Sequence, residues 1–134
     1  MASQSPPAPD ARRVLIVEDD SHIAMAMEYL LSREGVQADH ITSGAGAVAR
    51  VRADRPALVL LDVMLPEVSG FDICQQIRAD PTLAGVKVLM LTARGSAADL
   101  RRARDEGADA FLAKPFEVRD FRREVRRLLN LSGG

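Results

Sequence analysis

A chain of 134 residues with 47% hydrophobic residues has room for one domain with a proper core, and it is too apolar to be disordered throughout. The formal net charge of -1 argues against broad binding to nucleic acid or to an anionic membrane. No apolar run approaches the ~18–20 residues that cross a bilayer. The single cysteine, Cys74, cannot form an internal disulfide, so we expect a reducing, cytoplasmic setting.

The two ends of the chain differ in composition from the rest. Residues 1–11 carry Pro6, Pro7 and Pro9 among small polar residues, and they lack the apolar core of a signal peptide. We therefore expect a disordered tail over 1–11, a single domain over 12–130 and a loose end over 131–134.

Short hydrophobic runs alternate with helical patterns along this domain. We expect strands at residues 13–17, 36–41, 57–61, 86–91 and 110–113. The first helix is expected to start at Ser21, which can cap it, and to stop at Gly35. The later helices are expected at residues 45–53, 71–80, 97–106 and 117–129.

Five strand–helix units with short connections predict an α/β fold. Right-handed crossovers then place helices on both faces of one parallel sheet, and the fully apolar run at 57–61 is typical of a strand covered on both faces. In such sheets, ligands bind beyond the carboxyl ends of the strands, where the strand order reverses. Residues that directly follow the strands are therefore the candidates for chemistry.

Acidic residues follow the first and third strands. Glu18, Asp19 and Asp20 come after residues 13–17, and Asp62 comes after residues 57–61. Carboxylates that share a crevice repel each other unless a cation lies between them, and Mg²⁺ prefers oxygen ligands. The acidic pair Glu18 and Asp19 alone could belong to a solvated loop, and Asp62 alone could cap a turn. Together they predict a metal site in which Asp62 attacks phosphorus as a nucleophile.

A hydroxyl and an ammonium follow the fourth and fifth strands. Thr92 could donate a hydrogen bond to a phosphoryl oxygen, and Lys114 could neutralise its charge. Each is a weak signal alone, since a threonine at a strand end is usually structural and most lysines are solvated. A cis bond between Lys114 and Pro115 would turn the lysine over the crevice, although the sequence does not determine the isomer.

Six short motifs follow one another across residues 12–130. They are VLIVEDD at 14–20, LDVMLP at 61–66, GFD at 70–72, LTARG at 91–95, GAD at 107–109 and KPF at 114–116. In this order and spacing they resemble the response-regulator receiver domain of two-component signalling. The resemblance implies a single-domain, doubly wound sheet of five parallel strands in the order 2-1-3-4-5, the flavodoxin-like arrangement of chemotaxis receivers.

The resemblance also implies a role for each acidic residue. Asp62 corresponds to the aspartate that accepts a phosphoryl group, and Asp19 to a direct ligand of Mg²⁺ or Mn²⁺. Glu18 corresponds to the neighbouring acid that acts largely through water, while Asp20 has a lesser role. Asp62 and the backbone carbonyl of Met64 complete the protein's share of the metal shell.

The remaining matched residues correspond to the switch of the family. Thr92 matches the switch hydroxyl, Lys114 the family lysine and Phe111 the switch aromatic, while Met64 and Arg94 match positions that tune loss of the phosphoryl group. Phosphorylation would draw Thr92 inward and let Phe111 turn from exposed to buried. Alternatively, Phe111 is a permanently buried strand aromatic.

The implied partners are a histidine kinase or histidine phosphotransfer protein, which supplies the phosphoryl group, and a downstream protein. The downstream protein would dock on the surface of residues 97–106, 110–113 and 117–129. We expect a monomer or weak dimer, because Arg101, Arg104 and Arg122 fall where winged-helix regulators of the family form a two-fold dimer, and like charges repel there. Of the charge pairs of that dimer, only Asp105 with Arg126 is retained.

The arginines of residues 117–129 resemble a basic stripe of the kind that binds nucleic acid, but Asp120 and Glu124 balance their charge. We therefore expect a solvated helix face and no direct contact with nucleic acid or membrane. We also expect His22 and His40 to be solvated and Cys74 to be a small core residue.

The implied activity is that of a phospho-accepting signalling domain, not an enzyme, which assists only its own phosphotransfer and dephosphorylation. A stand-alone receiver is favoured over a fragment of a longer transcriptional regulator. An aspartyl-phosphate phosphohydrolase is disfavoured, because Met64 stands where its second aspartate would supply a proton.

Overall fold

The computed structural model describes residues 10–93 and 96–131 of the chain, apart from the side chains of residues 10 and 11. Its strands are β1 (Asp10–Val17), β2 (Gln37–Ile41), β3 (Pro56–Asp62), β4 (Lys87–Thr92) and β5 (Ala110–Ala113). Its helices are α1 (Ser21–Ser32), α2 (Ala47–Asp54), α3 (Gly70–Ala79), the short 3₁₀ helix η1 (Pro81–Leu83), α4 (Ala97–Asp105) and α5 (Val118–Leu129). All the strand pairings are parallel and the order is β2-β1-β3-β4-β5, which confirms the predicted sheet.

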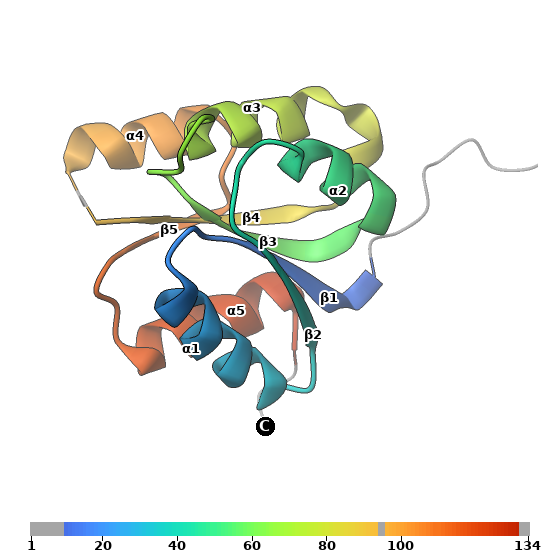
Figure 1. Ribbon diagram of the computed structural model, residues 1–134, viewed down its shortest axis with the longest axis vertical. Helices are drawn as coiled ribbons and strands as arrows, with labels where there is room; N and C mark the ends of the chain where they lie inside the picture. Colours follow the sequence, from blue (N-terminus) through green and yellow to red (C-terminus); the bar gives the residue numbers. More distant parts are fainter. Residues whose placement is uncertain (1–9, 94–95, 132–134) are drawn as a thin grey trace, which may run out of the picture.

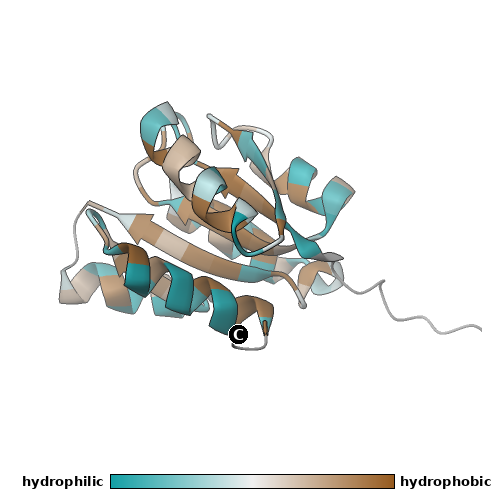
Figure 2. Cartoon of the chain, turned by 90° about the horizontal axis from the view of Figure 1, so that it is seen from below, coloured by the Kyte–Doolittle hydropathy of each residue, from teal (hydrophilic) through white to brown (hydrophobic). Residues whose placement is uncertain are grey.

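The sheet lies between two layers of helices (Figure 1). α2, α3 and α4 cover one face, and α1 and α5 cover the other. Alternate residues of β3 enter the two cores, with Val59 and Leu61 on the first face and Leu58 and Leu60 on the second. Figure 2 shows central strands that are hydrophobic along their length and helices with hydrophilic outer sides. Burial on both faces therefore explains the uninterrupted apolar run of β3.

The element boundaries differ from the sequence predictions at a few points. β1 starts at Asp10, ahead of the predicted start at residue 13, and η1 was not predicted. Residues 1–9 and 132–134 lie outside the described part, so the division into one domain and two loose ends stays a prediction. Within residues 10–93 and 96–131, no helix is long and apolar enough to cross a membrane.

The cap of α1 is Asp20 and not Ser21, so that prediction was wrong. The Asp20 carboxylate accepts hydrogen bonds from the backbone N–H groups of His22 and Ile23, at 2.9 and 3.3 Å. A carboxylate at this place satisfies free N–H groups of the first turn and also interacts well with the helix dipole. Asp20 therefore has a structural role in the loop that carries the other two acids.

Gly70 starts α3 against the end of β3. Its N–H donates to the carbonyl oxygen of Val63 at 3.0 Å, and a Cβ atom at this position would overlap the carbonyl oxygen of Asp62. A side chain here would push α3 away from the strand that carries Asp62.

A double ion pair joins the turn after α1 to α5. The Nε atoms of Arg122 and Arg126 each lie 2.9 Å from a carboxylate oxygen of Glu34, whose side chain is 7% exposed. The hydrogen bond from Arg126 outweighs desolvation and holds the pKa of Glu34 below its usual value, with Arg122 adding to the effect. Arg123 and Arg127 pair with Asp120 and Glu124 on the helix itself, as predicted.

Replacing Glu34 with glutamine should lower the free energy of unfolding at pH 7 by roughly 1–2 kcal/mol, because two charge-assisted hydrogen bonds are lost. The lowered pKa means that the wild-type advantage is full above the unfolded pKa of about 4.3 and disappears as pH falls through the folded pKa. Urea unfolding at neutral and acidic pH measures both effects. Glu28→Gln on α1 is the control, and equal losses in the two variants would contradict the role of the pair.

Candidate functional site

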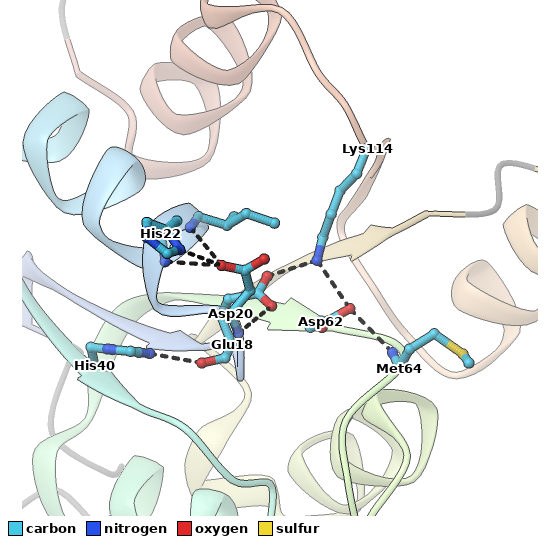
Figure 3. A network of polar contacts seen from close by, with 8 residues as sticks. Glu18, Asp20, His22, His40, Asp62, Met64 and Lys114 are labelled. Atoms are coloured by element: carbon cyan, nitrogen blue, oxygen red, sulfur yellow. Dashed lines mark hydrogen bonds and ion pairs between the residues drawn. The ribbon is translucent and has the colours of Figure 1, made fainter.

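The parallel register brings the predicted site residues to one edge of the sheet. Val17 pairs with Leu61, so Glu18 and Asp19 lie beside Asp62, one residue further along. One carboxylate oxygen from each of these three acids lies within 4.8 Å of the others. Lys114 reaches in from the end of β5, with its Nζ atom 2.7 Å from Glu18 Oε1 and 3.4 Å from Asp62 Oδ1 (Figure 3). Residues from three strands thus form one charged cluster.

Glu18 is bound through every polar atom it has. Its N–H donates to the Ile41 carbonyl at 3.1 Å, and its carbonyl lies 2.7 Å from His40 Nε2. Its side chain accepts from the Asp20 N–H at 3.2 Å and from Lys114 Nζ at 2.7 Å. The residue is only 1% exposed, so this acid is fixed in place by β2, the α1 loop and β5.

Burial changes the proton affinity of the ion pair. Burial raises the pKa of Glu18 to about 7, and the hydrogen bond from Lys114 only partly opposes this effect. Burial would lower the pKa of Lys114, but the hydrogen bond to Glu18 and the charge of Asp62 outweigh it, so this pKa is raised. Lys114 therefore stays positively charged near neutral pH, while Glu18 gains or loses its proton there.

Asp19 and Asp62 offer oxygen atoms to a ligand. Asp19 is exposed, and no residue in the described part of the chain forms a hydrogen bond or ion pair with its carboxylate. The Asp62 side chain is 4% exposed, and its Oδ1 atom accepts from the Met64 N–H at 3.1 Å. Among the described residues, Oδ2 of Asp62 has no hydrogen-bond donor. One oxygen is therefore oriented by the backbone, and the other is available.

This donor set fits a divalent cation of the Mg²⁺ or Mn²⁺ type. Carboxylate oxygens are the ligands that these ions prefer, and Asp19 presents a carboxylate that is not already engaged. The cluster opens into a crevice of about 700 Å³ whose lining also includes Ile23, Ala26 and Phe116. The crevice therefore has an acidic floor and an apolar wall. The Met64 carbonyl as a ligand stays a prediction.

The switch candidates lie around this cluster. Thr92 is the last residue of β4 and is buried, and its carbonyl accepts the Lys114 N–H at 2.6 Å. Phe111 is half-buried in a groove of about 190 Å³ that Leu100 and Arg104 also line. The Lys114–Pro115 bond is cis.

Arg94, the second predicted tuning position, lies outside the described residues. For two of the three residues that are expected to have no role in the phosphoryl chemistry, the structure agrees with the prediction. The His22 side chain is 96% exposed, and Cys74 is fully buried, where desolvation raises the pKa of its thiol to about 11.

The prediction that His40 is solvated was wrong. The residue is half-buried, and its ring contacts the carbonyl of Glu18. A histidine near the end of an edge strand has no distinctive pattern in sequence. Only the pairing of Val17 with Ile41 shows that it lies beside the end of β1.

This fold and this acidic edge define a receiver domain, and comparison with known proteins agrees. The family model for the response regulator receiver domain matches residues 14–126. The chain therefore belongs to the receiver domains of two-component response regulators, as its motifs suggested.

Individual relatives support the same assignment. The DNA-binding response regulator MtrA of Mycolicibacterium paratuberculosis is 39% identical over 118 residues, which cover 88% of this chain and 51% of MtrA. The chain thus spans about half the length of the curated relatives it matches.

Two solved structures share the fold. The signal receiver domain of a signal transduction histidine kinase from Syntrophus aciditrophicus has a TM-score of 0.81 and 32% identity, covering 91% of this chain and 93% of that one. The receiver domain of the sensor histidine kinase PA1611 from Pseudomonas aeruginosa PAO1, solved with a magnesium ion in its active site cleft, has a TM-score of 0.80 and 27% identity. That match covers 89% of this chain and 98% of the other.

The raised pKa of Glu18 predicts how the metal-free fold responds to pH. The folded state binds this proton more tightly than the unfolded chain, so stability is lost as pH rises from the unfolded pKa through about 7. The slope is at most about 1.4 kcal/mol per pH unit for one group. Calorimetry in a chelator should therefore show a higher Tm at pH 6 than at pH 8.

Glu18→Gln should remove this part of the pH dependence, because the amide does not titrate. Glu117→Gln, at a side chain that is 67% exposed, is the matched control and should keep the wild-type slope. Identical slopes in the wild type and Glu18→Gln would contradict the assignment.

Proposed function

We propose that this receiver accepts a phosphoryl group on Asp62 from the phosphohistidine of a histidine kinase or histidine phosphotransfer protein, in the cytoplasm. Mg²⁺ would be held by Glu18, Asp19, Asp62 and the backbone carbonyl of Met64. The observation that carries the proposal is the convergence of three carboxylates within 4.8 Å beneath the Lys114 ammonium. A cluster of this kind is costly without a cation to balance its excess negative charge.

Asp62 is suited to act as the nucleophile. The Met64 N–H fixes Oδ1, which leaves Oδ2 free to attack phosphorus in line. The new bond joins this oxygen to phosphorus as the phosphorus–nitrogen bond of the donor breaks, and the imidazole nitrogen keeps the electron pair. Bound Mg²⁺ would offset the negative charges of the carboxylates and the phosphoryl group.

The other residues act on the transferred group. Lys114 can turn from its present partners toward the phosphoryl oxygens, because its Nζ lies between Glu18 and Asp62. The Thr92 hydroxyl would donate to another oxygen. Ile23 and Phe116 line the same crevice and offer an apolar wall for the imidazole ring of the donor.

The signal would pass through Phe111. Movement of Thr92 toward the phosphoryl group makes room for the half-buried ring to turn inward, which changes the groove that it shares with Leu100 and Arg104. The surface of α4, β5 and α5 then favours or disfavours a downstream protein. This is a population shift driven by contacts that only the phosphorylated state makes.

Two forms of output are consistent with this mechanism. In the first, the receiver works alone and its surface binds a separate protein. In the second, it controls a DNA-binding domain in the same polypeptide, which is favoured by the match to only about half the length of MtrA, a DNA-binding response regulator. A phosphohydrolase is less well supported, because Met64, 60% exposed, offers no proton to a leaving group.

Intact-mass measurement tests the acceptor. After incubation with Mg²⁺ and acetyl phosphate, the wild type should gain one phosphoryl group and Asp62→Asn should gain none. Asp72→Asn, at an exposed residue of α3, should still be phosphorylated. A gain in Asp62→Asn would place the acceptor elsewhere. No gain in the wild type, with either acetyl phosphate or a phosphorylated kinase, would overturn the proposal.

Sedimentation should show that the phosphorylated protein stays monomeric or forms only a weak dimer. Arg101 and Arg104 are exposed and have no acidic partner among the described residues, so they would repel across a two-fold axis. Glu34 already binds Arg126, the expected partner of Asp105 in such a dimer. A tight dimer that Arg104→Glu disrupts, while the exposed Arg119→Glu does not, would contradict this prediction.

A further inference from the structure

His40 is the penultimate residue of the edge strand β2 and has no place in the phosphoryl chemistry above. Its Nε2 atom nevertheless lies 2.7 Å from the carbonyl oxygen of Glu18 (Figure 3). A carbonyl oxygen only accepts, so Nε2 must carry the proton that is shared. Both the imidazolium and the neutral tautomer protonated at Nε2 provide it, so the contact does not require a charged ring.

This contact fixes the peptide that joins Glu18 to Asp19. β2 holds both backbone groups of Glu18, through the Ile41 carbonyl at 3.1 Å and the His40 ring at 2.7 Å. The next peptide is held as well, because the Asp20 N–H donates to Glu18 Oε2 at 3.2 Å. Asp19 therefore lies between two anchored peptides.

The Asp19 side chain itself is held by nothing in the described part of the chain. It is exposed, and yet one of its oxygens lies within 4.8 Å of oxygens from Glu18 and Asp62. Three carboxylates at this separation repel one another, so without a cation an unrestrained Asp19 would turn toward solvent. The anchored backbone is what keeps its carboxylate directed to the cluster.

We propose that His40 is a positioning residue for the divalent cation, which holds the Glu18–Asp19 peptide so that the Asp19 carboxylate faces the site before the ion binds. The inference rests on the proposed function for the existence of the metal site. Hydrogen bonds that orient metal ligands raise metal affinity because less ordering is left for the binding step. A purely structural contact would stabilise the fold and leave the affinity unchanged.

Mg²⁺ affinity of the metal-free protein, measured by an NMR titration of backbone amides with MgCl₂, tests the proposal. His40→Phe keeps a ring of similar size and removes the donor, and it should raise the Mg²⁺ Kd on the order of tenfold. His40→Gln retains an N–H donor and should lie closer to the wild type. Gln37→Ala, at an exposed residue of the same strand, should leave the Kd unchanged.

A second readout separates positioning from chemistry. With acetyl phosphate as the donor, His40→Phe should need more Mg²⁺ for half-maximal phosphorylation but reach the wild-type rate at saturation. Thermal unfolding of each variant is recorded first, and His40→Met serves as a second donor-free variant if the phenylalanine does not fold.

A wild-type Mg²⁺ Kd in a folded donor-free variant would overturn the proposal, and so would a wild type that does not bind Mg²⁺. The titration contains no phosphoryl donor, so its result stands apart from the test of Asp62. A wild type that binds Mg²⁺ more tightly than His40→Phe but is never phosphorylated would overturn the proposed function and support the role of His40.

Discussion

The contact of Lys114 with Glu18 and Asp62 is the interaction on which the site depends. It joins residues that follow β1, β3 and β5. The Lys114 side chain is 14% exposed and the side chains of Glu18 and Asp62 are 1% and 4% exposed, so none of these charges has full hydration. Buried charges are tolerated only when they are paired. The sheet edge is consequently held together by the same groups that would bind and release a phosphoryl group.

Some polar atoms of the acidic cluster have hydrogen-bond partners within the protein, and others do not. Every polar atom of Glu18 and one carboxylate oxygen of Asp62 form hydrogen bonds. The Asp19 carboxylate has no hydrogen-bond or ion-pair partner among the described residues. The bound atoms keep the geometry, and the free atoms are the ones that a cation and a phosphorus atom would contact. In the proposed mechanism, such an arrangement would lower the reorganisation that accompanies cation binding and phosphoryl transfer.

The outer helices show how the remaining charges are used. Glu34, in the turn after α1, neutralises two arginines of α5, and two acids on α5 pair with other arginines of the same helix. The helix that resembles a basic stripe in sequence is therefore largely balanced in the fold. Arg101 and Arg104 on α4 have no such acidic partner among the described residues, so the surface beside Phe111 carries uncompensated positive charge. A downstream protein that docks on this surface, as proposed, would have to accommodate that positive charge.

The sequence by itself determined the alternation of strands and helices, because apolar periodicity and helix stop signals are local. It also placed Glu18, Asp19, Asp62, Thr92 and Lys114 at strand ends, and the family motifs supplied the strand order. Only the tertiary structure decided that Asp20 caps α1, that His40 binds the Glu18 carbonyl and that Glu34 binds two arginines of α5. The last two contacts join residues distant in sequence, and the choice of cap depends on the backbone conformation at Asp20. Local patterns record neither the register that brings distant residues together nor the backbone angles that aim a side chain.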